Sequence, residues 1–369
     1  MLAGLAAIDS RIKTRTGHLW EEVFTNAAQH NSLTTVAIGP TWRGNLVAAN
    51  AWSSSHGLSH IGDGQHVGFI NDFYDDEGWW ASAWIAVYDL NHDSKYLDQA
   101  VTIFNDLDAA WNSTPVGGLW WNKKHEYVNA ITNELYFSIA AHLDNRCPND
   151  RERYINSAQA AWRWLFSSGI FTSQRNVKDG LAVGSNPGAT EIVWSYNQGV
   201  VLSALTELSA ATFQDLYIGI AKLIADAALA NLTSADVNED AVATLRDPCE
   251  AEMWCGIDGA TFKGVFARNL AHLHSVSPED KYAEFLRNNA DALWTRSRDQ
   301  YNRLGLVWGG PFTEPAGASM QCSGMDLFVG ALSQLGEWNS DTESAKSGIG
   351  KRSFNARTGR LTREFFGLW

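Results

Sequence analysis

Two adjacent aspartates, Asp75 and Asp76, stand near the start of a long aromatic run, NDFYDDEGWWASAWIAVYDL, at positions 71–90. When two carboxyl groups are close together, the charge on one disfavours charge on the other, and their pKa values separate. Glycoside hydrolysis uses such a pair, one carboxyl ionised as nucleophile or base and the other protonated as acid. The pair therefore indicates cleavage of a sugar linkage.

The residues after the pair predict the helix that positions it. Trp80, Trp84 and Tyr88 recur every four positions, with small apolar residues between them, which predicts a helix buried on nearly all sides. Asp75 and Asp76 then fall where an N-cap is expected, and carboxylates are favoured there, so a capping pair is the structural alternative.

The polar residues around the pair favour chemistry over capping. Asn71, Asp72, Tyr74 and Glu77 crowd amide, acid and phenol groups at the same place, which is more than a cap needs. Consecutive α-carbons lie about 3.8 Å apart. That spacing suits the roughly 5 Å carboxyl separation of retaining enzymes better than the roughly 6.5 Å or more of inverting ones. Retention is therefore favoured, although rotamers that widen the gap leave inversion open.

The string YDDEGWWASAWIAVYDL resembles the signature of glycoside hydrolase family 76, the α-1,6-mannanases. Five later strings match the same family in the same order: GGLWWN (117–122), NAITNELYF (129–137), DGL (179–181), SYNQGV (195–200) and FKGVFARNLA (262–271). The resemblance extends from about Trp42 to Ala331.

The resemblance implies roles for three carboxylates. Asp75 takes the role of nucleophile, Asp76 that of general acid and base, and Asp179 contacts the sugar near the cleavage point. The reverse assignment of the first two remains open, and Asp179 before a glycine is also a common turn residue.

The implied activity is retaining cleavage inside α-1,6-linked mannan of the fungal cell-wall type, with no cofactor or metal. The other candidates for sugar contact are polar or aromatic residues of the same motifs, each of which could instead cap a helix or pack: Asn71, Tyr74, Trp79, Trp120, Trp121, Asn129, Asn133, Tyr196, Asn197, Gln198, Lys263, Phe266 and Arg268. Because Trp120 and Trp121 are neighbours, at most one of them faces the cleft if the segment is extended.

Helical periodicity along the chain predicts an all-α fold. Apolar helices begin near 77, 130, 196, 262 and 319, each but the last followed by an amphipathic helix, and Trp42–Ser53 is a sixth apolar candidate. This pattern predicts an (α/α)6 barrel of six inner and six outer helices in a single domain, residues 1–343. The loops before the inner helices would meet at one end. Residues 344–369 form a basic tail without an assigned role.

Composition limits the partners. A net charge of -13 argues against nucleic-acid binding, while 17 Trp, 10 Tyr and 16 Phe among 369 residues suit sugar stacking as well as a large core. No run of 18 apolar residues predicts a membrane span. The first residues, MLAGLAAI, are too short for an export signal, but the resemblance implies an extracellular or cell-wall location. We expect a monomer.

Cysteines and histidines give weaker signals. Cys249 and Cys255 are close enough to form a bridge, which an oxidising compartment would allow, and the sequence leaves that open. His56, His60 and His66 match no usual ligand spacing, so we expect a polar loop there and no metal site.

Three other functions remain open from the sequence. The same residues would serve a cell-wall transglycosidase acting on the glycan of lipid-anchored (GPI-anchored) mannoproteins, since a sugar hydroxyl can replace water. A non-catalytic mannan-binding protein would keep the cleft alone. The cluster DFYDDE also resembles a magnesium-binding motif of terpene cyclases, but the sequence has no second such motif.

Overall fold

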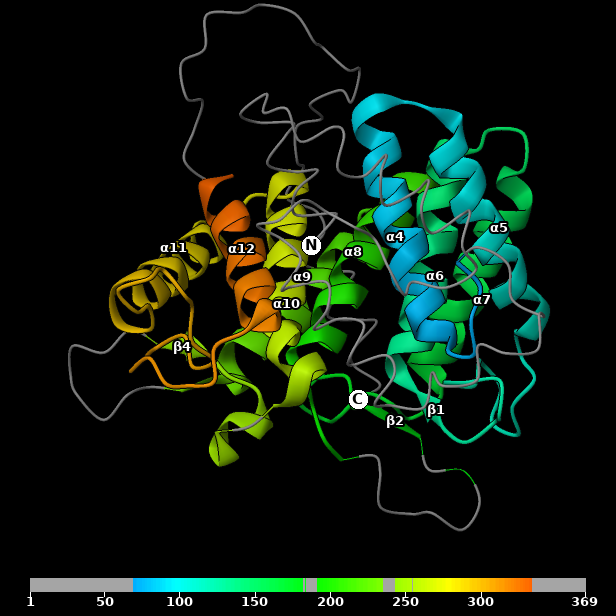
Figure 1. Cartoon of the computed structure of the whole chain (residues 1–369). Coiled ribbons are helices and arrows are strands. Elements are labelled where there is room, and N and C mark those ends of the chain that lie inside the picture. Colours follow the sequence, from blue (N-terminus) through cyan, green and yellow to red (C-terminus); the bar gives the residue numbers. More distant parts are fainter. Residues whose placement is uncertain (1–68, 182, 184–190, 235–242, 254, 334–369) are drawn as a thin grey trace, which may run out of the picture.

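The computed structural model describes residues 69–333 except 182, 184–190, 235–242 and 254. Helices dominate this part of the chain (Figure 1): α4 Tyr74–Asn91, α5 Ser94–Ala110, α6 Ala130–Arg146, α7 Arg151–Ser167, α8 Ser195–Thr212, α9 Leu216–Asn231, α10 Gly256–Val276, α11 Asp280–Arg296 and α12 Ala318–Leu332. A 3-10 helix, η3, spans Pro248–Glu252.

The helices alternate between an inner and an outer layer. Inner helices α4, α6, α8, α10 and α12 pack side by side in that order, and α5, α7, α9 and α11 lie outside them. Helices α6 and α8 are buried along almost their whole length because they have neighbours on both sides. The predicted all-α architecture of the (α/α)6 barrel type is confirmed.

The outer helices show the amphipathic pattern that the sequence predicts. In α5 the buried side chains recur once per helical turn, singly or as adjacent pairs: Tyr96, Leu97, Ala100, Ile103, Phe104 and Leu107. This is the face expected for a helix that covers one side of a core. None of the described helices is long and apolar enough to cross a membrane.

Two expectations about helices need correction. Helix α10 begins at Gly256, six residues before the predicted start, because the glycines at its beginning conceal the helical pattern. Helix α4 is buried on one side and not on nearly all, and Trp79 and Trp80 are partly exposed, because α6 is its one inner neighbour in the described part. The predicted helix Trp42–Ser53, the histidines before residue 69 and the tail 344–369 lie outside the described residues.

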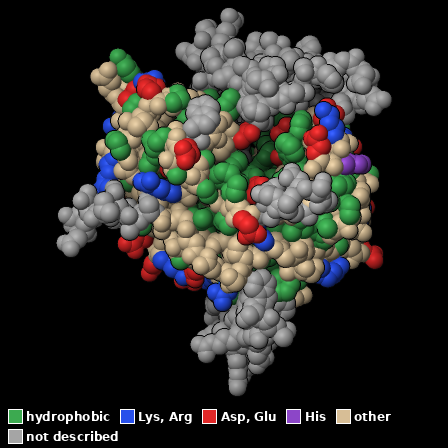
Figure 2. All heavy atoms as spheres, turned by 90° about the horizontal axis from the view of Figure 1, so that it is seen from below, with side chains coloured by type: hydrophobic (Ala, Val, Ile, Leu, Met, Phe, Trp, Pro, Cys, Tyr) green, Lys and Arg blue, Asp and Glu red, His purple; other side chains and the backbone are tan. Residues whose placement is uncertain are grey.

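Two short strand pairs lie in the connections that precede α6, α8 and α10. Strand β1 (Val128–Asn129) pairs antiparallel with β2 (Gly180–Leu181), and β3 (Thr233–Ser234) pairs with β4 (Thr244–Leu245). The sequence patterns did not predict these strands, since two residues are too few for a period. The loops before α4, α6, α8 and α10 meet at the lower end of the molecule in Figure 1, as predicted. Figure 2 shows that end hollowed, with acidic and apolar side chains around the hollow.

Glycines set the spacing of the inner helices α8, α10 and α12. A Cβ on Gly199 of α8 would lie 2.7 Å from the Cα of Phe266 on α10. A Cβ on Gly264 of α10 would lie 2.6 Å from the Cα of Ser323 on α12, whose hydroxyl accepts the Gly264 N–H at 2.9 Å. Only glycine allows backbones to approach so closely.

A charged cluster joins the C-terminal ends of four inner helices. Arg146 of α6 contacts Asp89 of α4 at 2.6 Å and Glu207 of α8 at 3.0 Å. Glu207 also faces His142 of α6 and His272 of α10, with N–O distances of 3.4 and 3.7 Å. These partners hold the pKa of Glu207 down at about 2, against the effect of burial.

Replacing Gly199 with alanine will test the close approach of α8 and α10. The added methyl group has no room beside the backbone of Phe266, and overpacking of this kind costs about 1–3 kcal/mol. Urea unfolding of the Gly199→Ala variant will show a lower midpoint with an unchanged slope. Gly317→Ala is the control, since nothing lies within 4 Å of its Cβ; equal stability of the two variants would contradict this account of the spacing.

The charged cluster predicts a loss of stability in acid that depends on His142. Burial lowers the pKa of His142 from 6.5 to about 4, so the unfolded chain binds a proton first as the pH falls. The contribution of a neutral His142 is complete above pH 6.5 and is lost as the pH falls through about 4. At 1.36 kcal/mol per pKa unit, this loss amounts to about 3 kcal/mol.

The measurement is the free energy of unfolding of the parent chain and of His142→Gln between pH 7 and pH 4. The glutamine cannot titrate, so the parent will lose stability relative to the variant across this range. Parallel curves for the two proteins would show that His142 does not carry the effect.

Candidate active site

The aspartate pair lies in the first turn of α4, where a neighbouring loop docks. Phe73 is the N-cap residue, and the N–H of Tyr74 donates to the carbonyl oxygen of Trp121 at 3.0 Å. Asp75 and Asp76 are the second and third helical residues, and neither side chain caps the helix. The expectation that they occupy the N-cap is therefore wrong by two positions, because Tyr74 already has helical geometry.

Asp75 has one oxygen bound and one without a partner. The indole Nε1–H of Trp121 donates to its Oδ2 at 3.0 Å, while the buried Oδ1 has no hydrogen-bond partner in the described part of the chain. Burial raises the pKa of Asp75 well above its usual range, and the Asp76 carboxylate raises it further. The Trp121 hydrogen bond and the amides of the first turn oppose that rise.

Asp76 is the second carboxyl of the pair, and its surroundings favour the protonated form. Burial raises the pKa of Asp76 to about 7, and the carboxylate of Asp258, in the first turn of α10, adds to the rise. With both pKa values raised, the pair retains a proton near neutral pH, shared as a coupled unit. The Trp121 indole lowers the pKa of Asp75 and the Asp258 carboxylate raises that of Asp76, whereas burial and the charge of Asp76 raise the pKa of Asp75.

Glu77 and Lys123 anchor the start of α4. The buried Glu77 accepts the backbone N–H of Asn71 at 2.9 Å and pairs with Lys123 at 2.9 Å, and Lys123 also contacts Asp106 at 2.9 Å. Burial raises the pKa of Glu77 to about 8, which Lys123 opposes. Asn71 is engaged too, since its Oδ1 accepts the N–H of Phe73 at 2.7 Å. These contacts fix the backbone from which the pair projects.

Asp179 is brought to the same end by β2. Its Oδ2 accepts the hydroxyl of Tyr127 at 2.8 Å, and its backbone carbonyl accepts the N–H of Ala130 at 2.6 Å. Burial raises its pKa, while the hydrogen bonds from Tyr127 and Trp194 lower it. Asp179, which was predicted from the DGL motif, is thus held rigidly beside the start of α6.

Tyr196, at the start of α8, lies among these carboxylates. Burial raises its pKa well above the usual range, and the charges of Asp179 and Asp75 add to the rise. Its ring stacks on Phe262 with centroids 3.8 Å apart. The aspartate pair, Asp179 and Tyr196 therefore form one group, contributed by the start of α4, the connection before α8 and the first turn of α8.

Three of the predicted sugar-binding amides instead hold the loops in place. Asn129 is the N-cap of α6 and accepts the N–H of Thr132. Asn133 binds both the N–H and the carbonyl of Leu119, and Gln198 does the same for Val177. Asn133 and Gln198 are fully buried, and their amides are engaged by the backbone of these loops.

Asn197 is also fully buried, and its partner is an acid that sequence reasoning did not select. Its amide Nδ2 donates to Glu134 Oε2 at 3.2 Å. Burial raises the pKa of Glu134 well above the usual range, with Asp179 adding to the rise. The pair lies beneath the site, between α6 and α8.

The remaining candidates divide between the core and the rim. Lys263 is 1% exposed and bonded to Glu250 at 2.7 Å and to the carbonyl of Leu306, while Phe266 is fully buried, so neither side chain is available to a sugar. Arg268 pairs with Asp326 at 2.8 Å and lies 5.6 Å from the ring of Trp79.

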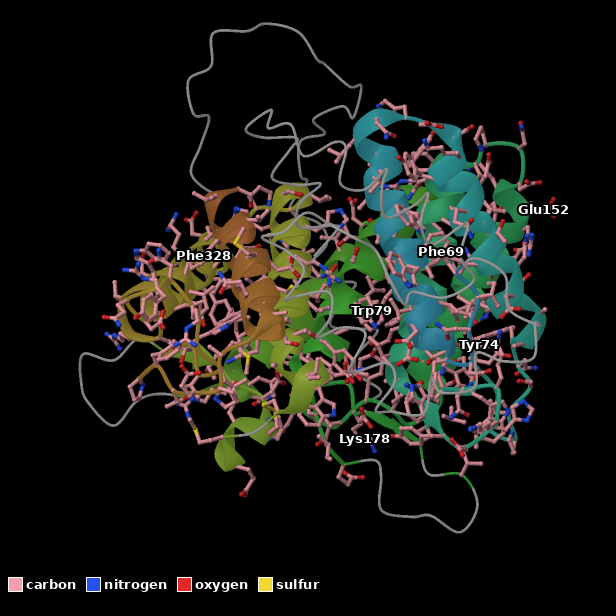
Figure 3. All side chains as sticks on the ribbon, viewed as in Figure 1. Phe69, Tyr74, Trp79, Glu152, Lys178 and Phe328 are labelled. Carbon is pink, nitrogen blue, oxygen red and sulfur yellow. A yellow bond between two sulfur atoms is a disulfide. The ribbon has the colours of Figure 1, made fainter. Side chains whose placement is uncertain are left out.

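The other aromatic candidates lie at different depths. Trp120 is nearly buried and stacks on His125. Trp121 is therefore the one of the two tryptophans that faces the aspartates, in agreement with the expectation that at most one would do so. Tyr74 is 8% exposed and its ring lies 5.2 Å from the Lys123 ammonium. Figure 3 shows Trp79 on the side of α4 towards the middle of the molecule and Tyr74 near its lower end.

Sequence reasoning missed Asp258, Tyr127 and Phe262 as members of this group. Asp258 lies between Gly256 and Gly259, four residues before the FKGVFARNLA string, and these glycines concealed the first turn of α10. Tyr127 comes two residues before the NAITNELYF string. In residues 69–333 as described, no three His, Cys, Asp or Glu side chains are placed to share a metal ion.

Comparison with known proteins agrees with this arrangement. The model of glycosyl hydrolase family 76 matches residues 62–341. Mannan endo-1,6-alpha-mannosidase DFG5 of Candida albicans is 26% identical over 234 residues, covering 59% of this chain and 50% of the relative. DCW1 of the same organism, with the same enzyme name, is 29% identical over 223 residues, covering 56% and 48%. The chain therefore spans about half the length of these relatives.

Solved structures share the fold. The α-1,6-mannanase of a Salegentibacter species has a TM-score of 0.63 at 21% identity, covering 78% of this chain and 81% of that one. A variant of that enzyme described as inactive has asparagine in place of two consecutive aspartates and is in complex with α-1,6-mannotriose; its TM-score is 0.62 at 20% identity, with 78% and 81% covered.

The family match extends over more than half of the chain and includes the aspartate pair, Asp179 and the whole row of inner helices. This chain belongs to glycosyl hydrolase family 76.

Proposed function

We propose that this protein cleaves internal α-1,6-mannosidic bonds of mannan with retention of configuration. The observation that supports the proposal most directly is the carboxyl pair in the first turn of α4, with the Trp121 indole on one member. Asp75 is the nucleophile and Asp76 the general acid and base.

In the first step Asp75 attacks the anomeric carbon of a mannose unit. Its Oδ1, which has no partner among the described residues, forms the new bond, while Oδ2 keeps the Trp121 hydrogen bond. The glycosidic C–O bond breaks, and Asp76 gives its proton to the departing oxygen. The charge of Asp258 favours a protonated Asp76 before this step.

In the second step water replaces the enzyme carboxylate. Asp76, now ionised, takes a proton from the water as its oxygen attacks the anomeric carbon, and the bond to Asp75 breaks. Both carboxyl groups return to their starting states. A sugar hydroxyl in place of water would give transglycosylation from the same intermediate.

The choice of α-1,6-mannan rests on the relatives, two of which are named mannan endo-1,6-alpha-mannosidases. It is supported by the inactive double-asparagine variant of a structural neighbour, which is in complex with α-1,6-mannotriose. We assign sugar contacts to Trp121, Asp179, Tyr196 and Trp79, because these side chains surround the aspartates or the partly exposed face of α4. We place the protein outside the cell or in the cell wall, in keeping with the Cys249–Cys255 disulfide.

Incubation with debranched α-1,6-mannan will test the reaction, with products resolved by size and anomeric configuration over time. We expect short oligomannosides whose new reducing ends first form in the α configuration. Asp75→Asn and Asp76→Asn will each lower the rate by at least about 10²-fold, because each removes a group that acts in the transition state.

Asp98→Asn is the matched control, since Asp98 is exposed on the outer helix α5. It will keep the parent rate, and thermal unfolding will show whether each variant is folded. Products of β configuration would overturn the retaining mechanism. Transfer to an added oligomannoside, without release to water, would assign the chain as a transglycosidase.

The rate will depend on pH through Asp76. The acid must carry its proton, so kcat/KM will fall as the pH rises through about 7, the pKa of Asp76. It will also fall as the pH drops below the pKa of Asp75, which burial and the charge of Asp76 raise above the usual range. Asp258→Asn removes a like charge that raises the pKa of Asp76, and the alkaline limb will move to lower pH.

Asp280→Asn is the control for this shift, because Asp280 is an exposed aspartate in the first turn of the outer helix α11. Its alkaline limb will coincide with that of the parent. An alkaline limb that stays in place in Asp258→Asn would show that Asp258 does not act on the acid.

A further inference from the structure

Two segments of the chain match the acceptor pattern for N-linked glycosylation, Asn-X-Ser/Thr with X other than proline. They are Asn112-Ser113-Thr114 and Asn231-Leu232-Thr233. The pattern alone does not distinguish the two, because both end in threonine. The structure places them in different surroundings.

The disulfide bears on whether either asparagine meets a glycosylation enzyme. Cys249 and Cys255 are bridged, and disulfides persist in oxidising compartments such as the lumen of the secretory pathway. In eukaryotes the same lumen holds the lipid-linked oligosaccharide donors. The bridge and the acceptor pattern are thus independent features that suit one compartment.

Asn112 is presented in a turn just after α5. It is exposed and has φ of 63°, a left-handed conformation in which asparagine is tolerated better than most residues. Its Oδ1 faces the inside of the turn, where a Cβ on Gly117 would lie 3.0 Å away. Among the described residues, no hydrogen bond engages its amide nitrogen.

Thr114 makes that turn rigid from below. Its side chain is buried. Its hydroxyl donates to the carbonyl of Gly117 at 2.5 Å and accepts the N–H of Val116 at 3.2 Å. The carbonyl of Val116 in turn accepts the indole N–H of Trp164 at 2.9 Å. A sugar on Asn112 would therefore extend from a fixed turn into solvent without displacing any of these contacts.

Asn231 is the last residue of α9, and its amide is already in use. Its Nδ2 donates to Asn176 Oδ1 at 2.6 Å, and Asn176 is only 2% exposed. Asn231 is exposed, but a sugar on this nitrogen would crowd the contact with the buried Asn176. The fold accommodates a glycan on Asn112 and opposes one on Asn231.

We propose that Asn112 carries an N-linked glycan and that Asn231 does not. The Nδ2 of Asn112 attacks C1 of the first sugar of an oligosaccharide held on a lipid diphosphate. A C1–N bond forms, the bond from C1 to the diphosphate oxygen breaks, the diphosphate leaves with the electron pair, and one amide proton is lost. The proposal does not depend on the reaction of the cleft.

The test is expression of the full chain behind a secretion leader in yeast, with cells and medium analysed together. Electrophoretic mobility and intact mass are compared before and after peptide N-glycosidase. We expect one discrete shift on treatment of the parent, the same shift for Asn231→Asp, and none for Asn112→Asp. Aspartate keeps the size of the side chain and lacks the acceptor nitrogen.

Peptide mapping of the treated parent gives a second reading that needs no variant. The enzyme leaves aspartate where the glycan stood, so we expect conversion at position 112 and asparagine at 231. A parent without sugar, conversion at 231, or a shift that persists in Asn112→Asp would each overturn the proposal.

Discussion

The cost of placing two carboxyl groups side by side, partly out of water, governs the arrangement of this protein. Asp75 and Asp76 cannot both be charged there at neutral pH without large repulsion, so the pair keeps a proton. The surroundings act differently on the two members. A neutral donor, the Trp121 indole, lies against one carboxyl, and a further negative charge, Asp258, acts on the other. The loops, caps and strand pairs at this end serve to hold those two influences in place.

Buried amides do most of that holding. Asn133 and Gln198 each satisfy both the N–H and the carbonyl of a loop residue, as a neighbouring strand would. A loop fastened in this way can carry Trp121 or Asp179 with little freedom, even though the strands beside it are only two residues long. The unpaired backbone groups of the loops would otherwise be costly to bury.

The sequence predicted the layers of this fold well and the roles of its amides poorly. Helical periodicity depends on apolar side chains, so it located α5, α6 and α8 closely, but the glycines at positions 256 and 259 concealed the first turns of α10 and with them Asp258. The aspartate pair was found because two carboxyl residues next to each other in the sequence already indicate their chemistry. An amide that binds a sugar and an amide that binds a loop look the same in the sequence. Only the burial of Asn133 and Gln198 in the structure distinguishes the two roles.

The glycine contacts between α8, α10 and α12 have a consequence for how such enzymes diversify. The backbones of α8, α10 and α12 already touch at Gly199 and Gly264, so side-chain changes there cannot bring these helices closer together. Selection for longer, shorter or branched substrates must then act on the loops at the open end, where insertions leave the wall untouched.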